Sequence, residues 1–368
     1  MRVICDRCGI EKEFRIAKWR CDCGGAWEPA IQDPFNQGKI YGCDYSIWRY
    51  GEMLGLDVRR PVKRMGVGWT PLVSIRLDDQ LVYLKLEFLS PSGSFKDRGV
   101  NAMVNQLISM GAKKMVEDSS GNAGASLAAH AARFGIKAQI YVPAYASPHK
   151  LTQISIYGVE VKTIPGPRKA AEDAAKVCAS PEVAYASHAY NPAYLAGQTT
   201  AAWEMWEQLG KETPDWIFCP VAQGGQFLGL WFGFKRLLSA GLIDRLPRLV
   251  AVQSAMIAPI YNAWMQGLNY VPGVEPNGTT IAEGVAIAKP ARGGRILQAI
   301  RETGGEILAI GELDIIKAQN KLAHLGFYIE PTSALAAAGF YQLQLKIKHN
   351  EIVVIPLTGS GLKGKPKY

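Results

Sequence analysis

The chain of 368 residues lacks any run of eighteen apolar residues, so we expect no helix that crosses a membrane. Its first residues, Met1 to Arg7, lack the apolar core of a secretory signal peptide. No internal repeat is visible, so a repeat architecture is not expected. These absences predict a cytoplasmic protein without a membrane partner, and the length allows two or three globular domains.

Acidic side chains are in short supply, because 32 Asp and Glu stand against 41 Lys and Arg, a formal net charge of +9. The basic residues are spread along the chain, apart from a tail at Lys363, Lys365 and Lys367. We therefore expect no nucleic-acid partner. Either the positive field concentrates anionic small molecules or the surface is an ordinary solvated basic one. The content of 48% apolar residues is that of a globular protein.

Cysteine is concentrated at one end of the chain, where four of the seven form the pairs Cys5-x2-Cys8 and Cys21-x-Cys23. Glycine follows each pair, as in tight knuckles around one ion, and four thiolates suit tetrahedral zinc. Residues 1–30 thus predict a zinc-ribbon-like module. The spacing of the second pair is uncommon, so a ribbon that has lost its metal stays an alternative, as does a nucleic-acid contact.

After a stretch rich in glycine and proline over residues 31–70, strand-like apolar runs alternate with helical patterns. This alternation predicts parallel sheets with helices on both faces. In such sheets, ligands bind where loops leave the carboxyl ends of strands and enter helices. The strands that precede candidate binding loops are expected at Leu81 to Leu89, Lys114 to Asp118, Trp216 to Val221 and Ile352 to Leu357. A helix is expected at Val100 to Met110, directly after the first of these loops. The other helices are expected at 123–134, 153–157, 170–178, 195–209, 227–238, 315–325 and 333–345, and the other strands at 138–142, 159–164 and 249–253.

Lys96 follows the first of these strands, within Gly93-Ser94-Phe95-Lys96-Asp97-Arg98-Gly99. Small neighbours let a flat ring approach, and partial desolvation lowers the pKa of an amine so that it can attack a carbonyl. This setting is typical of a lysine that forms an imine. Lys96 is therefore the candidate catalytic residue, and pyridoxal 5'-phosphate is the expected cofactor.

Three further loops carry polar or glycine residues at strand ends. Ser119-Ser120-Gly121-Asn122 offers hydroxyl and backbone N–H groups for a carboxylate, and its asparagine can donate to a phenolic oxygen; plain helix capping is the alternative. Gln223-Gly224-Gly225-Gln226 can wrap a phosphate, or form a tight turn. Thr358, before Gly359-Ser360-Gly361, can donate to a pyridine nitrogen, which favours elimination and replacement over transamination; a simple C-terminal turn is the alternative.

Together, the Lys96 segment, the Ser-Gly-Asn loop, the glycines at 224–225 and the late Thr-Gly-Ser-Gly sequence resemble the fold-type II pyridoxal phosphate enzymes. The resemblance covers roughly residues 65–368 and is strongest to the threonine synthase branch. The N-terminal cysteines and Asn191-Pro192, followed by Gly197-Gln198-Thr199, also match that branch.

The resemblance implies an α/β fold with two doubly wound parallel-sheet domains, as in the tryptophan synthase β chain, and a small N-terminal cysteine ribbon. The cofactor would lie in the cleft between the two domains, and the enzyme would be a homodimer. The implied domains are the cysteine knuckle at 1–30, a large cofactor-binding domain at 31–99 plus 191–368, and a small mobile domain at 100–190.

The resemblance also implies a role for each matching residue. Lys96 would hold the cofactor aldehyde and move the Cα and Cβ protons, Asn122 would bond the ring O3′, and Thr358 would bond the ring nitrogen. The cofactor phosphate would be held by Gln223, Gly224, Gly225 and Gln226. The substrate would be bound by Ser119, Ser120, Ala123, His188, Tyr194 and Gln198. The metal ligands would be Cys5, Cys8, Cys21 and Cys23.

Several positions depart from the threonine synthase pattern. Tyr194 stands where the family has an arginine in Asn-Pro-x-Arg-Leu, His188-Ala189 replaces Asn-Ser, and Ala123 replaces threonine. These changes together remove most of the charge-assisted hydrogen bonds that a substrate phosphate needs. We therefore expect an altered substrate-phosphate pocket.

The expected function is a pyridoxal phosphate-dependent carbon–oxygen lyase that acts at the α and β carbons of an amino acid. The nearest reaction is that of threonine synthase, from O-phosphohomoserine to threonine. A β-replacement synthase similar to cysteate synthase is one alternative. A serine or threonine dehydratase is another, which Ala282-Glu283-Gly284-Val285-Ala286 also resembles. A catalytically silent ligand sensor belongs to a different class, and the intact Lys96 argues against it.

Overall fold

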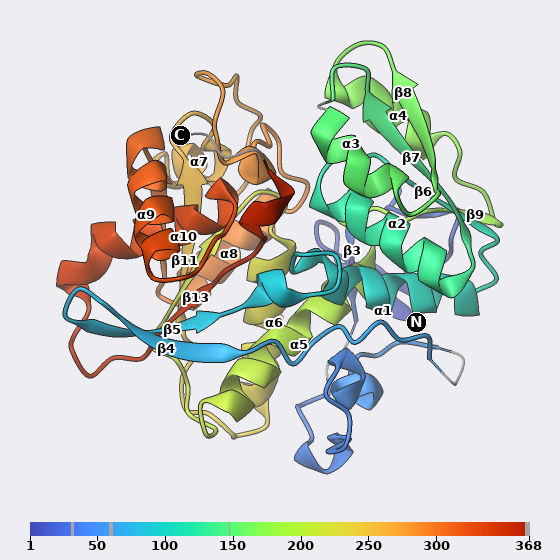
Figure 1. Cartoon of the computed structure of the whole chain (residues 1–368). Helices are drawn as coiled ribbons and strands as arrows, with labels where there is room; N and C mark the ends of the chain where they lie inside the picture. Colours follow the sequence, from blue (N-terminus) through green and yellow to red (C-terminus); the bar gives the residue numbers. More distant parts are fainter. Residues whose placement is uncertain (31–32, 59–61, 147, 365–368) are drawn as a thin grey trace. The chain divides into compact units, whose positions relative to one another are not determined.

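The computed structural model describes residues 1–30, 33–58, 62–146 and 148–364, and it divides into two compact units. Unit 1 comprises Met1–Gln32, Asn36–Gly68 and Ser90–Gln198, and unit 2 comprises Asp33–Phe35, Trp69–Leu89 and Thr199–Tyr368. Each unit contains its own parallel sheet (Figure 1). Each unit also has its own apolar core. Parts of the predicted glycine-rich stretch (31–32 and 59–61) and of the basic tail (Lys365 and Lys367) lie outside the described residues.

Unit 1 is built on a four-stranded parallel sheet of strand order β8-β7-β6-β9. Met115, Ile140 and Val142 pack against one layer of helices, whereas Val116 and Tyr141 pack against α4 on the opposite face. The strands are β6 (Lys114–Glu117), β7 (Lys137–Pro143), β8 (Glu160–Ile164) and β9 (Val183–Tyr185). The helices are α1 (Lys96–Ser109), α2 (Asn122–Phe134) and α3 (Pro148–Ser155) on the first face and α4 (Arg168–Lys176) on the second.

The N-terminal module also belongs to unit 1. It is an antiparallel sheet of order β2-β1-β3, as expected for a small cysteine ribbon. Its residues Val3, Phe14 and Trp27 join the same apolar core as α1 and α2. The three strands are β1 (Arg2–Cys5), β2 (Glu11–Glu13) and β3 (Trp27–Pro29).

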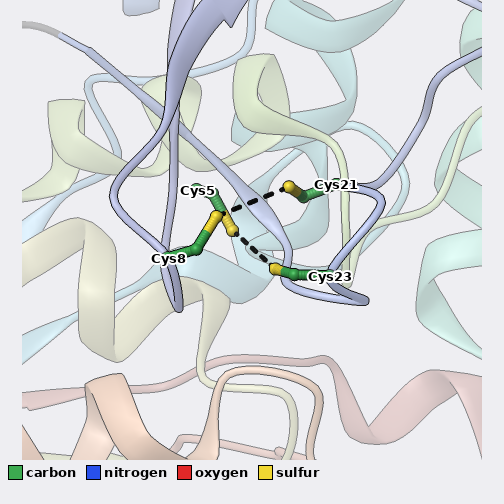
Figure 2. Close-up of side chains that lie close together, drawn as sticks. All are labelled: Cys5, Cys8, Cys21 and Cys23. Carbon is green, nitrogen blue, oxygen red and sulfur yellow. Dashed lines mark hydrogen bonds between the residues drawn. The ribbon is translucent and has the colours of Figure 1, made fainter.

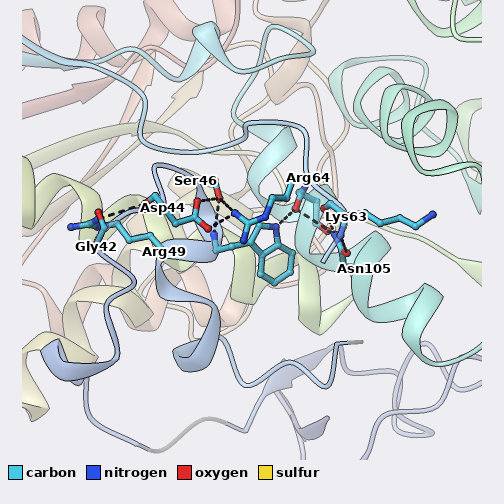
Figure 3. A network of polar contacts seen from close by, with 9 residues as sticks. Gly42, Asp44, Ser46, Arg49, Lys63, Arg64 and Asn105 are labelled. Carbon is cyan, nitrogen blue, oxygen red and sulfur yellow. Dashed lines mark hydrogen bonds and ion pairs between the residues drawn. The ribbon is translucent and has the colours of Figure 1, made fainter. Parts of the chain in front are cut away.

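The segment from residue 36 to residue 68 is mostly irregular, with short 3-10 helices at Gln37–Lys39 and Ile47–Met53. An ion pair and hydrogen bonds join parts of this segment to one another and to helix α1 (Figure 3). Buried Asp44 pairs with Arg64 and accepts from Ser46 Oγ at 2.6 Å. Asn105 of α1 exchanges two bonds with the Lys63 backbone, at 2.8 and 3.0 Å. This segment is thus held by specific bonds rather than by regular structure.

Unit 2 contains a six-stranded sheet of order β12-β11-β10-β13-β5-β4, parallel except for the antiparallel hairpin β4–β5. Its core is almost wholly apolar, as parallel sheets covered on both faces require. The strands are β4 (Leu72–Leu77), β5 (Gln80–Lys85), β10 (Trp216–Pro220), β11 (Arg248–Ser254), β12 (Glu306–Ile310) and β13 (Val353–Pro356).

Helices cover both faces of this second sheet. Phe218, Val250 and Val252 pack against α9 and α10, and the alternation of side chains along a strand turns their neighbours toward α6 and α8. The helices are α6 (Gly225–Ser239), α7 (Pro259–Met265), α8 (Gly293–Glu302), α9 (Glu312–His324) and α10 (Pro331–Leu343). Helix α5 (Pro192–Gln208) begins in unit 1 and ends in unit 2.

The predicted fold class is confirmed, with corrections at the level of elements. Helix α1 begins at Lys96 itself rather than at Val100, because no cap residue marks its start. The first predicted strand, Leu81 to Leu89, ends at Lys85 and gives way to a 3-10 helix at Glu87–Leu89. No strand was expected at β1, β2, β3, β4, β9 or β12, and no helix at α7 or α8. Among the described residues, no helix combines the length and apolar character needed to span a bilayer.

One buried ion pair ties the β5 strand to the part of α5 in unit 2. Lys85 and Glu204 have fully buried side chains, and Lys85 Nζ lies 2.9 Å from Glu204 Oε2. The ammonium also donates to the Thr70 carbonyl at 2.6 Å and to Gln208 Oε1 at 2.8 Å. All three protons of the ammonium are therefore used, which a buried charge requires.

We expect Lys85→Ala to lower the free energy of unfolding by about 3–5 kcal/mol, because it leaves the Glu204 carboxylate buried without its cation. Urea denaturation followed by circular dichroism measures this change. Lys346→Ala, which breaks an exposed pair with Glu306, is the control and should cost less than about 1 kcal/mol. Equal losses in the two variants would contradict the interpretation.

Candidate active site

Lys96 is the first residue of α1, in a segment held by the carboxylate of Asp97. Asp97 is fully buried and accepts from Ser92 N at 2.7 Å, from Ser92 Oγ at 2.6 Å and from Ser126 Oγ. Lys96 is only half-buried, with Nζ 4.4 Å from the centroid of the Phe95 ring. The backbone on both sides of the lysine is thus fixed while its side chain keeps access to a ligand.

Two glycines allow α1 and the start of α5 to approach closely. A Cβ atom at Gly99 would collide with the Tyr194 ring, and one at Gly197 would collide with the Arg98 carbonyl. Gln198 then donates to the Phe95 carbonyl at 3.2 Å. In the described part of the chain, the buried atoms Tyr194 OH, Gln198 Oε1 and Ser94 Oγ have no hydrogen-bond partner. Such atoms are costly unless a ligand or water satisfies them.

The Ser119–Asn122 loop connects β6 to α2. The helix begins at Asn122 with Gly121 as its N-cap, and no side chain caps it. Ser119 Oγ instead accepts from Gly121 N at 3.3 Å. The N-cap position is thus a glycine, which offers no side chain for capping. The first N–H groups of the helix are oriented as in sites that bind a carboxylate.

Glu117 and His188 form a buried pair at the carboxyl end of β6. His188 Nδ1 lies 2.8 Å from Glu117 Oε1, and the side chains are 11% and 1% exposed. Burial raises the pKa of Glu117 to about 8, although the charges of Lys96 and Arg168 oppose this. Burial and the Lys96 charge lower the pKa of His188 to about 3. Both side chains are thus uncharged at neutral pH.

In unit 2, the Gln223–Gln226 segment leads into α6 and includes its first two residues, Gly225 and Gln226. The N-cap Gly224 has a φ of 80° and no side-chain cap. A Cβ atom at Gly224 would meet the Ile296 side chain at 2.5 Å, so only glycine fits. Gln223 Oε1 accepts from Ala291 N at 2.8 Å and thereby holds a neighbouring loop. Gln226 is buried, and within the described residues neither its Oε1 nor its Nε2 has a partner.

Thr358 follows β13, the strand that pairs with β10, so its loop and the Gln223–Gln226 loop leave the same edge of the sheet. The Thr358 side chain is fully buried, and its Oγ1 lies 2.9 Å from Ser333 Oγ. Ser333 Oγ in turn accepts from Gly359 N at 2.8 Å. The threonine hydroxyl is thereby held in place at the strand end.

Each unit thus assembles part of the predicted site. Unit 1 gathers Lys96, the Ser119–Asn122 loop, His188, Tyr194 and Gln198, whereas unit 2 gathers the Gln223–Gln226 loop and Thr358. Ala123, predicted to face the substrate, is buried on α2 and offers only a methyl group. The roles of all these residues remain predictions.

The sequence analysis missed three groups that the structure places here. Glu117 is the last residue of β6. Its position, as an acid at the end of an apolar strand, could have indicated it from the sequence. Ser333 at the start of α10 and the Asp97–Ser126 bond had no signal, because each joins elements that are distant in sequence. Arg168, at the start of α4, also belongs here, because its charge acts on both Glu117 and His188.

Comparison with known proteins defines the class. Residues 63–359 match the family described as pyridoxal-phosphate dependent enzyme. Threonine synthase of Methanocaldococcus jannaschii is 33% identical over 98% of this chain and 92% of the relative. That of a Synechocystis species is 34% identical over 86% and 82%. The chain therefore belongs to the pyridoxal-phosphate dependent enzyme family. Within it, the chain is a threonine synthase-like lyase of fold type II.

Solved structures agree with this fold. A threonine deaminase from T.th. superposes with a TM-score of 0.68 at 26% identity, covering 81% of this chain and 94% of that one. Maize serine racemase gives a TM-score of 0.68 at 21% identity, covering 79% and 88%. The second likeness bears on the fold alone.

We expect Gly224→Ala to weaken binding of pyridoxal phosphate at least tenfold, because the added methyl group displaces the α6 N-terminus against Ile296. Titration of the apoenzyme with the cofactor, followed by absorbance, measures this. Gly210→Ala is a matched control: Gly210 has a φ of 69° but open space around its Cβ position. Equal loss of affinity in the two variants would show that backbone strain, not the loop, is responsible.

Proposed function

We propose that this chain converts O-phosphohomoserine to threonine, or acts on a close analogue, with pyridoxal 5'-phosphate bound to Lys96 as a Schiff base. The proposal depends on one observation. Lys96 lies half-buried at the start of α1, among buried polar atoms that have no partner in the described structure. The 33% identity to a threonine synthase over nearly the whole chain supports the reaction class.

The residues present fit this cofactor. Gln226 has two buried polar atoms without a partner in the described structure, next to the uncapped N-terminus of α6, where a phosphate would satisfy them. Gly224 and Gly225 would donate their backbone N–H groups to the same phosphate. Asn122 would bond the ring O3′, and Thr358 would donate to the ring nitrogen.

When bound, the cofactor supplies an electron sink for negative charge at the substrate Cα. The protein supplies the rest. Lys96 takes the proton from Cα and returns one at Cα or Cβ, because its amine is held beside the ligand by the Asp97 bonds. The uncapped start of α2, with Ser119 and Ser120, binds the substrate carboxylate. Gln198 orients the segment of Lys96 through the Phe95 carbonyl.

The residues proposed to meet the substrate side chain differ from those expected to hold a phosphate. Tyr194 and His188 are buried and uncharged, since burial raises the pKa of Tyr194 well above its ordinary value and lowers that of His188 to about 3. The charges of Lys96 and of Arg168, from α4, both reach His188. The uncharged side chains of Tyr194 and His188 favour a second candidate function, dehydration of serine or threonine, whose leaving group is a hydroxyl.

We expect the purified protein to absorb near 410–430 nm, as protonated imines of this cofactor generally do, and Lys96→Ala to abolish the band. Turnover would be compared with O-phosphohomoserine, O-phosphoserine, L-serine and L-threonine. Threonine formed from O-phosphohomoserine supports the first candidate. Pyruvate or 2-oxobutyrate formed from serine or threonine supports the second. A protein that takes up no cofactor would defeat both.

We further propose that Cys5, Cys8, Cys21 and Cys23 bind one zinc ion. Their Sγ atoms all lie within 4.8 Å of one another (Figure 2). Cys5 and Cys23 Sγ are 3.4 Å apart, and Cys8 and Cys21 Sγ 3.7 Å. A tetrahedral ion with Zn–S bonds of about 2.3 Å places its sulfurs about 3.8 Å apart, so this spacing suits it.

Elemental analysis of protein prepared without chelator should then find about one zinc per chain. Cys8→Ser should reduce the zinc content sharply, because a three-thiolate site binds zinc more weakly. Cys43→Ser, which alters an exposed cysteine outside the cluster, should leave it unchanged. Zinc well below one equivalent in the unaltered protein would contradict the proposal.

We also propose a cytoplasmic homodimer. All seven cysteines lie among the described residues and none of them is in a disulfide, which suits a reducing compartment. The family resemblance supports the dimer, and sedimentation equilibrium would measure it.

A further inference from the structure

We propose that Glu117 is a catalytic acid–base residue that acts on the oxygen at the substrate Cβ, and that His188 is the residue that positions it. This inference rests on the proposed function and deepens it. Under this proposal, Glu117 supplies or takes the proton when the Cβ–O bond breaks or forms. The substrate class it implies is an amino acid that carries, or gains, a hydroxyl at Cβ.

The position of Glu117 puts it among the groups expected to meet the substrate. It ends β6 immediately before Asp118 and the Ser119–Asn122 loop, at the carboxyl edge where ligands of parallel sheets bind. Strand β9 pairs with β6 on that side, so His188, which follows β9, reaches the same edge. The charge of Lys96 acts on both side chains.

The hydrogen bonds of Glu117 are incomplete. His188 occupies Oε1 at 2.8 Å, whereas Oε2 is buried and has no partner among the residues that the structure describes. Asp97, a buried acid with a structural task, shows the contrast, since both its oxygens accept bonds from Ser92 or Ser126. A carboxyl oxygen left open beside the catalytic lysine is the arrangement expected of a group that serves a ligand.

The protonation state of the pair suits this task. Burial is the largest influence on Glu117 and raises its pKa to about 8, so the side chain carries a proton at neutral pH. With neutral His188 donating from Nδ1 to Oε1, that proton resides on Oε2. The other titratable or charged groups that face the pair from neighbouring elements are Lys96, Asp118, Arg168, Glu172, Tyr185 and Tyr194.

The step balances without a further reactant. In the direction of dehydration, Lys96 takes the Cα proton and the electrons of that bond form the Cα–Cβ double bond. The Cβ–O bond breaks, its electron pair leaves with the oxygen, and Glu117 gives that oxygen its proton, so that water departs. Addition of water at Cβ is the same step reversed, with the Glu117 carboxylate receiving the proton.

The test separates the two proton transfers. The holoenzyme is incubated with L-serine or L-threonine in D2O, and Cα exchange is followed by NMR while pyruvate or 2-oxobutyrate is measured. We expect Glu117→Gln to keep Cα exchange within about threefold and to lower product formation about 100-fold or more, the usual contribution of a general acid. Glu182→Gln, at an exposed glutamate paired with Lys113, is the control and should change neither rate.

The pH profile provides a second check. Elimination needs protonated Glu117, so the ratio of product formation to Cα exchange should fall as pH rises through about 8. This fall should vanish in Glu117→Gln. His188→Asn, whose amide can still donate to Oε1, should retain more product formation than His188→Ala. Equal losses in the two histidine variants would overturn the positioning role.

A third readout does not depend on turnover. Infrared difference spectra of the holoenzyme without substrate, recorded against Glu117→Gln, should show the carbonyl band of a protonated carboxyl group at pH 6.5. That band should disappear with a midpoint near 8. Absence of the band at pH 6.5 would overturn the inference.

The outcomes distinguish this inference from the proposed function. A protein that binds the cofactor and exchanges the Cα proton, but forms no product from either amino acid, overturns the role of Glu117 alone. So does a Glu117→Gln variant with an unchanged product-to-exchange ratio. A protein that takes up no cofactor and exchanges no Cα proton overturns both.

Discussion

The chemistry proposed for this chain depends on how the buried carboxylate of Asp97 holds the segment around Lys96. Three donors from Ser92 and Ser126 converge on it, which fixes the turn before α1 and joins α1 to α2. Lys96 begins the helix that this carboxylate secures, so its backbone is fixed while its amine stays half-buried. Preorganisation of this kind places a nucleophile without further cost when the ligand binds.

Buried polar groups fall into two kinds in this molecule. In the Lys85 cluster, each donor meets an acceptor, and the cluster needs nothing from outside. Around Lys96 and in the glycine loop, by contrast, Tyr194, Gln198, Glu117 and Gln226 keep unpartnered atoms within the described structure. Since an unpaired buried group destabilises the fold, the groups kept in this state around Lys96 in unit 1, and separately in the glycine loop of unit 2, favour a ligand at each place.

The site residues predicted from the sequence are those whose chemistry is local. Lys96 among small residues, the glycines at 224–225 and Thr358 after an apolar run each carry their signal within a few residues. The start of α1 was missed because Phe95, its N-cap, makes no side-chain capping bond. Strand β9 was missed because it has only three residues, and β4 because it is the antiparallel edge strand.

The Glu117–His188 pair lay beyond such reasoning for a topological reason. The two residues are 71 positions apart, and only the pairing of β6 with β9 brings them together. Without that pairing, Glu117 is one more acid at the end of a strand, and His188 is a departure from a family pattern. Their contact and burial, not their identities, give the pair its uncharged state at neutral pH.

The most direct test of the account is to reduce the purified protein with borohydride and map its peptides by mass spectrometry. The account predicts a pyridoxyl group on the peptide that contains Lys96, with fragment ions that place it on the ε-amine. An unmodified Lys96 in protein that carries the cofactor, or the group on another lysine, would contradict it.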